Sequence, residues 1–252
     1  MRVAVIGASG LIGRDVIGIL QDKGHDVVGI ARSTGVDVYT GEGLAHALAG
    51  ADVVVDAVNA TTTDTEAVTG FFRTIARNVQ REAAAAGVRR IAVISIIGID
   101  RFTSGHYAGK LAQENAYRQG PVPVRILRAA QFHEFPEMML DWTTRGDTAY
   151  VPKYRARLVA ARTVAEQLAD SALAQTAPEL AEIAGPEEFD LAAAAAEVAA
   201  RRGRPARVEE IVDTDDPNHE LQATGALLPG PGAIIAGPTF GQWLDRKYPV
   251  QP

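Results

Sequence analysis

The chain has 252 residues, of which 47% are hydrophobic and 22% charged, a length and composition that suit one large α/β domain of a water-soluble protein. The formal net charge of −6 argues against a nucleic-acid partner, and the absence of cysteine excludes disulfides, thiol catalysis and thiolate metal sites. No apolar run reaches the roughly 18 residues of a membrane span and no leader precedes the first predicted strand, so we expect a cytoplasmic protein.

The N-terminal segment MRVAVIGASGLIG predicts a strand, a tight turn and a helix. Residues 2–6 form an apolar run, Gly7, Gly10 and Gly13 follow at three-residue spacing, and apolar residues then recur with helical periodicity. In such a segment glycines allow the turn, the approach to a pyrophosphate and the packing of helix on strand. We therefore predict a dinucleotide site formed by Gly7, Ala8, Ser9, Gly10, Leu11, Ile12 and Gly13. An ordinary βα turn is the alternative, and a P-loop is disfavoured because no Gly-Lys-Ser/Thr ending follows.

The end of the second predicted strand bears on the choice of cofactor. Residues 25–30 form this strand, and Ala31, Arg32 and Ser33 follow it. About twenty residues beyond the glycines, an acid binds the 2′-hydroxyl of the adenine ribose, whereas a basic residue accommodates a 2′-phosphate. Arg32 offers a guanidinium fork and Ser33 a hydroxyl, so NADP(H) is favoured and NAD(H) is less expected. A solvated loop arginine is the alternative.

Helices and strands then alternate along the chain. The pattern predicts a short strand over 37–39, a helix over 43–49, a buried strand over 51–58, a helix over 66–86, a strand over 90–97, a helix from 104 or 105 to about 119 and a strand over 123–127. This alternation is typical of an α/β protein with a parallel sheet and right-handed crossovers.

Polar residues stand near the carboxyl ends of two of these strands, at the edge where parallel sheets bind ligands. Asn59 follows the strand over 51–58, and Thr61, Thr62 and Thr63 come next, either to line the crevice or to cap the following helix. Ser95 lies near the end of the strand over 90–97, where it either takes part in chemistry or bonds the backbone within the core.

The second half of the chain is less regular. We predict a helix over 162–173, a strand over 180–184, an alanine-rich helix over 191–201, a mobile segment over 213–231 and a final helix near 240–246. No internal repeat or sharp linker is visible. Residues 1–252 are therefore expected to form a single domain, with a dinucleotide-binding core over 1–135 and substrate-side and C-terminal elements over 136–252.

Six segments carry a family resemblance. They are GASGLIG at 7–13, ARS at 31–33, DVVVDAVN at 52–59, VISIIGID at 93–100, YAGKLAQE at 107–114 and ILRAAQFHEF at 126–135. Together they resemble the atypical short-chain dehydrogenase/reductases of the NmrA-like or NAD(P)H-binding type. The resemblance implies a Rossmann-like doubly wound parallel sheet with a smaller C-terminal substrate-side segment. It also implies NADP(H) binding and, in enzymatic members, hydride transfer to a carbonyl, quinone or similar acceptor.

The resemblance further implies a catalytic set. Catalytic members use a tyrosine that exchanges the substrate proton, a lysine four residues later that holds the nicotinamide ribose, and a serine that orients the carbonyl oxygen. Here His106 stands four residues before Lys110 and Tyr107 three, and about 100° of helical rotation separates the two. Three interpretations stay open: His106 is the proton donor, Tyr107 reaches the site, or neither works and Lys110 only anchors the cofactor. Lys110 is the strongest candidate, and Ser95 is the candidate for the serine.

Two further groups follow the strand over 123–127. Phe132 stands where the family places residues against the nicotinamide, so we expect it to contact the cofactor, with core packing as the alternative. His133, Glu134 and Glu137 lack a second histidine at ligand spacing, so no metal site is predicted.

The leading functional hypothesis is an NADPH-dependent oxidoreductase that reduces a small carbonyl or quinone-type substrate. The first alternative is a non-catalytic regulatory protein of the NmrA type that senses NADP, and a weaker one is an isomerase or epimerase with bound NAD(P). The expected partner is a small-molecule substrate, with no nucleic acid and no membrane. The sequence identifies neither the substrate nor the oligomeric state.

Overall fold

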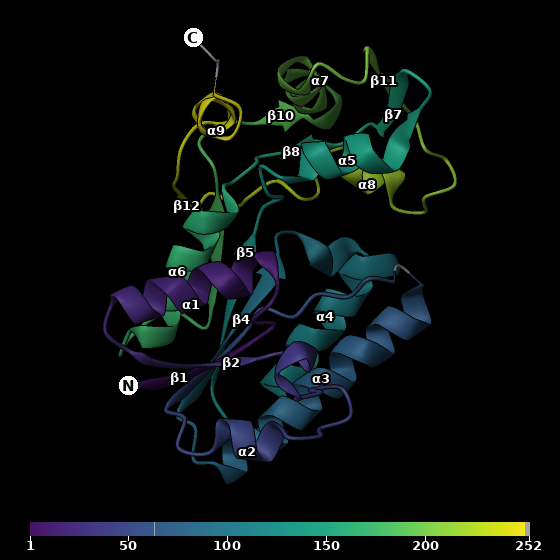
Figure 1. Ribbon diagram of the computed structural model, residues 1–252. Helices are drawn as coiled ribbons and strands as arrows, with labels where there is room; N and C mark the ends of the chain where they lie inside the picture. The colour runs from purple at the N-terminus through teal and green to yellow at the C-terminus, as the bar shows by residue number, and fades with distance from the viewer. Residues whose placement is uncertain (63, 250–252) are drawn as a thin grey trace. The chain divides into compact units, whose positions relative to one another are not determined.

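The computed structural model describes residues 1–62 and 64–249 (Figure 1). Thr63, one of the threonines considered for the crevice, and residues 250–252 lie outside the described residues. Within the described part, the centre is a seven-stranded parallel sheet with the strand order β12-β9-β5-β4-β3-β1-β2. Its strands are β1 (Arg2–Ile6), β2 (Asp26–Ile30), β3 (Val53–Asp56), β4 (Arg90–Ile96), β5 (Val124–Ala129), β9 (Leu180–Ala184) and β12 (Ile234–Ile235). The predicted α/β fold with a Rossmann-like parallel sheet is thereby confirmed.

The chain divides into two compact units. Unit 1 consists of Met1–Ile99, Thr103–Arg128 and Val164–Ala181. Unit 2 consists of Asp100–Phe102, Ala129–Thr163 and the chain from Glu182 onward. Unit 1 is therefore built from both halves of the sequence, because most of the helix over 161–173 and the start of the strand over 180–184 belong to it.

Unit 1 holds the helices that flank the sheet. They are α1 (Leu11–Asp22), α2 (Leu44–Leu48), α3 (Thr65–Ala85), α4 (Gly105–Arg118) and most of α6 (Ala161–Leu173), together with the short 3-10 helix η1 (Arg32–Thr34). A second 3-10 helix, η2 (Ile99–Arg101), lies where the chain passes from unit 1 into unit 2. α3 and α4 lie side by side, and α1 runs next to α6, where Lys23 after α1 pairs with Asp170 (Figure 1). The core buries Ile6 of β1, Val54 of β3 and Ile75 of α3 in one apolar cluster. Burial of such side chains drives the helices onto the sheet.

The predicted strand over 37–39 is wrong. Asp37 forms only an isolated antiparallel bridge with Glu42, and β2 is the edge strand of the sheet. The Asp37 carboxylate accepts hydrogen bonds from the amides of Tyr39 at 2.8 Å and Thr40 at 3.3 Å, so the backbone closes into a turn. A side chain that binds nearby amides competes with strand pairing, and apolar patterning does not reveal this competition.

Unit 2 contains smaller elements. They are the helices α5 (Phe135–Thr143), α7 (Leu191–Arg202), α8 (His219–Ala223) and α9 (Phe240–Lys247), a sheet of β6 (Thr144–Arg145), β7 (Thr148–Pro152) and β11 (Arg207–Ile211), and the pair β8 (Arg155–Ala156) and β10 (Phe189–Asp190). The sequence patterns missed α5 and the small sheet. In α5 the apolar residues do not keep to one face, since Met138 and Trp142 are exposed whereas Leu140 is buried. The segment over 213–231, predicted to be mobile, contains α8. There Asp216 accepts hydrogen bonds from the Asn218 amide at 2.8 Å and from Gln222 at 2.9 Å.

Candidate functional site

The turn between β1 and α1 is set by backbone contacts. Gly7 has a φ of +78°, and a Cβ placed there would lie 2.7 Å from the carbonyl oxygen of Ala57, just beyond β3. A Cβ at Gly13 would lie 2.1 Å from the Gly7 carbonyl oxygen. Both distances are far below van der Waals contact, so only glycine fits at either position. The turn therefore packs directly against the carboxyl end of β3.

The start of α1 leaves amides open to a ligand. The first helical hydrogen bond runs from the Arg14 amide to the Gly10 carbonyl at 3.1 Å, so the amides of residues 11–13 precede the helical ladder. No side chain caps this helix start, and Ser9 and Gly10 are exposed. An exposed, uncapped helix start fits a pyrophosphate, because the open amides and the positive end of the helix dipole both favour an anion.

Arg32 and Ser33 lie beside the glycine turn. The carbonyl of Ile30 at the end of β2 accepts hydrogen bonds from the amides of Gly7 and Ala8, at 3.0 and 3.2 Å. These bonds tie the end of β2 to the turn. Arg32 and Ser33 follow immediately in η1, and both are exposed. The contact of Arg32 and Ser33 with a phosphate stays a prediction.

Asn59 lies at the same edge of the sheet, three residues beyond β3. The Ala57 amide donates to the Ile6 carbonyl at 3.0 Å, which continues the ladder between β1 and β3 past the strand. Asn59 is exposed, and its side-chain oxygen accepts a hydrogen bond from the Ala60 amide at 3.0 Å. The cap of α3 is Asp64 rather than a threonine, since its carboxylate accepts the Ala67 amide at 2.8 Å.

Lys110 is buried on the inner side of α4. The start of this helix is fastened to α3, because the Gly105 amide donates to Thr65 Oγ1 at 2.8 Å. Lys110 is only 4% exposed, and its Nζ lies 4.8 Å from the centroid of the Phe72 ring. The ammonium donates to Gln113 Oε1, so it points into a polar cluster inside unit 1.

The acid of this cluster is Asp56 at the end of β3. It is fully buried and accepts hydrogen bonds from Gln113 Nε2 at 2.8 Å, from the Tyr117 hydroxyl at 2.6 Å and from the Val58 amide at 2.9 Å. The sequence analysis missed Asp56, Gln113 and Tyr117. The available signals were one acid inside an apolar strand and two polar residues three and seven positions after Lys110, which share its helix face.

Burial dominates the electrostatics of the cluster. It lowers the pKa of Lys110 to about 8, although Asp56 and Glu114 favour the charged form of Lys110. Burial also raises the pKa of Asp56, against the effects of Lys110 and of the hydrogen bond from Tyr117. Burial and the Asp56 charge raise the pKa of Tyr117 well above its ordinary value, so Tyr117 keeps its proton. Lys110 is the member whose pKa lies near physiological pH.

His106 and Tyr107 are both half-buried at the start of α4. The His106 ring meets the Phe72 ring edge-on, with centroids 5.5 Å apart. Burial, followed by the charge of Lys110, lowers the pKa of His106 to about 4, so its imidazole is neutral at physiological pH. The premise that His106 titrates near neutrality does not hold here, and a neutral imidazole is a weak proton donor.

Ser95 lies on β4 and is only 2% exposed. Its Oγ has no hydrogen-bond partner within residues 1–62 and 64–249, so it does not bond to their backbone as one interpretation suggested. A buried hydroxyl left without a partner costs free energy, which makes Ser95 a position that a ligand group or a water can satisfy.

Phe132 and His133 belong to unit 2. Phe132 is half-buried and forms an isolated parallel bridge with Val159. His133 is fully buried among aromatic rings, with centroids 5.3 Å from Phe240 and 5.5 Å from Trp243. Burial lowers the pKa of His133 to about 4, with the Leu158 backbone partly opposing that shift. The contact of Phe132 with a nicotinamide stays a prediction, whereas His133 has a role in packing.

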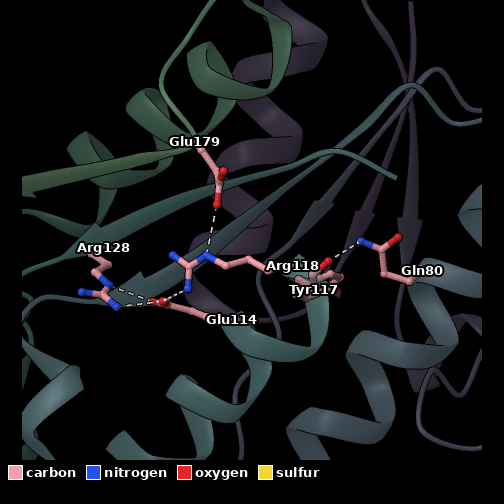
Figure 2. Close-up of polar contacts among 6 residues, drawn as sticks. All are labelled: Gln80, Glu114, Tyr117, Arg118, Arg128 and Glu179. Carbon is pink, nitrogen blue, oxygen red and sulfur yellow. Dashed lines mark hydrogen bonds and ion pairs between the residues drawn. The ribbon is translucent and has the colours of Figure 1, made fainter. Parts of the chain in front are cut away.

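A buried ion pair lies one helical turn after Lys110. Arg128 of β5 binds Glu114 of α4 through two contacts, Nε to Oε1 at 2.9 Å and Nη2 to Oε2 at 2.8 Å (Figure 2). Arg118 approaches the same carboxylate at 3.1 Å and reaches Glu179 with its Nε, also at 3.1 Å. The bidentate pair fixes α4 on β5, which holds the helix that carries Lys110 in place.

A parallel sheet whose first strand runs through a glycine turn into an uncapped helix defines the dinucleotide-binding class of α/β proteins. Residues 7–175 match the NAD(P)H-binding family, and the chain belongs to that family. The resemblance read from the sequence is thereby confirmed.

Solved structures share the fold at low sequence identity. The NADPH-dependent quinone oxidoreductase from Escherichia coli, solved with NADPH, has 16% identity and a TM-score of 0.71 over 98% of this chain and 99% of its own. A short-chain dehydrogenase/reductase superfamily protein from Agrobacterium tumefaciens, solved with bound NAD, has 17% identity and a TM-score of 0.69 over 98% of this chain and 95% of its own. The UDP-N-acetylglucosamine 4-epimerase from Bacillus cereus has 16% identity and a TM-score of 0.71 over 98% of this chain and 95% of its own. No curated protein matches the sequence significantly.

Two negative findings concern the described residues alone. Among them, no helix combines the length and apolar character that crossing a membrane requires. Nor do three histidine, aspartate or glutamate side chains within the described chain gather in a group that could hold a metal ion.

Proposed function

We propose that the protein is an NADP(H)-dependent oxidoreductase that reduces a small carbonyl or quinone-type substrate. The observation that carries the proposal is the exposed, uncapped start of α1 behind Gly7 and Gly13. Side chains cannot occupy these two positions, and open amides stand where a pyrophosphate binds in this class of fold. A bound reduced dinucleotide supplies a hydride, so the chain itself has to hold the cofactor, orient the substrate and manage one proton.

NADP(H) is the proposed form of the cofactor. Residues 31–33 contain no acid to bind a ribose 2′-hydroxyl, and they present Arg32 and Ser33 beside the turn. A guanidinium and a hydroxyl are suitable partners for a 2′-phosphate. Asn59 and the amides of residues 11–13 complete the proposed contacts at this edge of the sheet.

Proton supply favours quinones within the proposed substrate class. His106 is neutral at physiological pH because its pKa is about 4, and the Lys110 ammonium is engaged by Gln113. Reduction of an ordinary ketone leaves a strongly basic alkoxide that needs a proton donor, whereas a reduced quinone oxygen is a phenolate whose pKa is about 10. Solvent can protonate the phenolate after the reduction. Tyr107 is the side chain left on this helix for a substrate that does need a donor.

A second candidate function has its own supporting observation. The Lys110 side chain is 4% exposed and bonded within its own helix, rather than presented to a ribose. A protein in which Lys110 has only a structural role would bind NADP(H) and report its presence without turnover, as the NmrA-like resemblance also implies.

The two functions differ in a steady-state assay. We expect NADPH oxidation with a panel of quinones to exceed that with matched aldehydes and ketones by at least about tenfold, since only the latter need a dedicated acid. Tight NADPH binding with background oxidation across the whole panel would instead support the regulatory function.

The choice of cofactor has a separate test. The Arg32→Ala variant should weaken NADPH binding by about tenfold or more while leaving NADH binding nearly unchanged, because only NADPH carries the 2′-phosphate. Arg73→Ala, which removes an exposed arginine from α3, is the matched control and should change neither affinity. Equal losses for both cofactors in Arg32→Ala would contradict the proposed NADP preference.

The proton donor is tested by comparing Tyr107→Phe with His106→Ala. If Tyr107 donates, Tyr107→Phe should lower turnover of a ketone by about a hundredfold and turnover of a quinone much less. Unchanged turnover in both variants would remove general acid catalysis by this helix from the proposal.

A further inference from the structure

A pocket of about 550 Å³ opens at the amino ends of β4 and β5, within unit 1. Arg89 and Arg90 line it at the start of β4, Arg125 in β5 and Arg118 at the end of α4, and Glu179 is the only acid among the lining residues. Because the strands run parallel, this amino edge lies opposite the carboxyl edge that carries the glycine turn. The pocket is therefore separate from the candidate cofactor site.

A second pocket of about 510 Å³ adjoins the first one and shares Gly120 and Pro121 with it. Its lining includes Arg77 and Arg81 of α3 and contains no acid. The two linings together hold six arginines and one carboxylate, in a chain whose net charge is −6. Arg81 and Arg89 also have acidic partners outside the linings, Glu82 and Asp52 respectively. A local excess of positive charge in a concave surface raises the local concentration of anions.

The guanidiniums of Arg90 and Arg125 lie close together, at the same carbonyl oxygen. Both guanidiniums donate to the carbonyl of Ala174, just after α6, and Arg125 also reaches the carbonyls of Ser171 and Gln175. A helix C-terminus carries only partial negative charge, and neither arginine forms an ion pair with the described residues. Desolvation and the charge of Arg90 accordingly lower the pKa of Arg125. Two full charges at one carbonyl leave positive charge that an anion would compensate.

Arg118 also lines the pocket, and one of its two carboxylate partners, Glu179, can be displaced. Its Nη1 binds the buried Glu114, while its Nε binds Glu179 at 3.1 Å (Figure 2). The Glu179 side chain is 62% exposed, and such a surface pair contributes little to stability. An incoming oxyanion can therefore replace the Glu179 carboxylate on Arg118 at small cost.

We propose that the amino-edge pocket is a second ligand site, which binds a small molecule that carries phosphate groups. Guanidinium forks match phosphate oxygens with two parallel hydrogen bonds, which is the contact that Arg90, Arg118 and Arg125 can offer together. A pocket of this volume accepts a molecule of nucleotide size. The site does not depend on the proposed redox function.

The test is calorimetric titration of the full chain with inorganic pyrophosphate at constant ionic strength and in saturating NADPH, so that the candidate cofactor site is already occupied. Arg90→Gln should weaken binding by about tenfold or more, whereas the matched control Arg73→Gln on α3 should leave it unchanged. Repeating the titration with a nucleoside triphosphate distinguishes the sources of phosphate: tighter binding than pyrophosphate indicates a nucleotide, and equal binding indicates that phosphate groups alone suffice.

A gain-of-binding variant keeps the proposal testable if Arg90→Gln folds poorly. Glu179→Gln removes the competing carboxylate from an exposed position and should tighten pyrophosphate binding by about threefold. The proposal is overturned by the absence of saturable binding, by equal effects of Arg90→Gln and Arg73→Gln, or by pyrophosphate binding that NADPH abolishes, which would place the anion at the glycine turn.

Discussion

The glycine turn and the start of α4 are the two regions on which the proposed chemistry depends, and different interactions hold them. At the turn the backbone packs on itself, with Gly13 against the Gly7 carbonyl, and no side chain caps the start of α1. At α4 side-chain contacts hold the site, because Lys110 is buried and is connected through Gln113 to Asp56. A site made of backbone is insensitive to the rest of the sequence. A site made of buried side chains depends on every member of its cluster.

The largest combined loss, of cofactor affinity and of stability, is expected from a side chain at Gly13. Gly13→Val should lower dinucleotide affinity by at least about a hundredfold and stability by about 2–3 kcal/mol, because its Cβ has no room beside the Gly7 carbonyl. Cofactor fluorescence titration and urea unfolding measure the two losses. Gly18→Ala on the same helix is the control, since no atom lies within 4 Å of its added Cβ. The control should gain about 0.5–1 kcal/mol, and wild-type affinity in Gly13→Val would contradict the assigned turn.

The next effect tests the α4 cluster. Lys110→Met should lower stability at pH 7 by about 3–5 kcal/mol, because it leaves the Asp56 charge buried without a cation. The double variant Lys110→Met with Asp56→Asn should recover part of this loss, with a coupling of about 1–3 kcal/mol in urea unfolding. Strict additivity of the two single variants would show that Lys110 and Asp56 do not interact.

A smaller effect follows from the two buried histidines, one in each unit. The pKa of both His106 and His133 is lowered to about 4 in the folded chain, whereas an unfolded histidine titrates near 6.5. As pH falls from 6.5 towards 4, the unfolded state takes up protons that the folded state does not, so stability decreases across this window. Each histidine should contribute a loss of up to about 3 kcal/mol.

Unfolding measured between pH 7 and pH 4 checks the contribution of each histidine. His133→Phe should make the stability of unit 2 fall less as the pH is lowered, and His106→Phe should do the same for unit 1. His25, which lies in the loop before β2, offers a control: His25→Gln should keep the full decrease. Unchanged profiles in both phenylalanine variants would contradict the lowered pKa values.

The smallest expected effect concerns Ser95. Ser95→Ala should raise stability by up to about 1 kcal/mol, because it removes a buried Oγ that makes no hydrogen bond within the described residues. A fall in kcat without a loss of stability would support a contact with substrate. A loss above about 1 kcal/mol would show that the hydroxyl is bonded within the fold.

Much of the fold could be predicted from local patterns. The spacing of apolar residues and the glycines that end helices predicted several elements that the structure confirms. They include the strands over 2–6 and 180–184 and the helices around residues 11–22 and 65–85. The strand over 37–39 failed because the Asp37 side chain competes for the backbone. The helix α5 was missed because its apolar residues do not keep to one face: Met138 and Trp142 are exposed, whereas Leu140 is buried.

The candidate site divides in the same way. The sequence by itself determined the glycine turn and the position of Arg32, because both depend on the order of residues around one strand and one turn. Only the tertiary structure decided that Lys110 is buried beside Asp56 and that His106 is neutral. Burial and the pKa of a side chain are set by neighbours that are distant in sequence, and spacing along one helix carries no information about them.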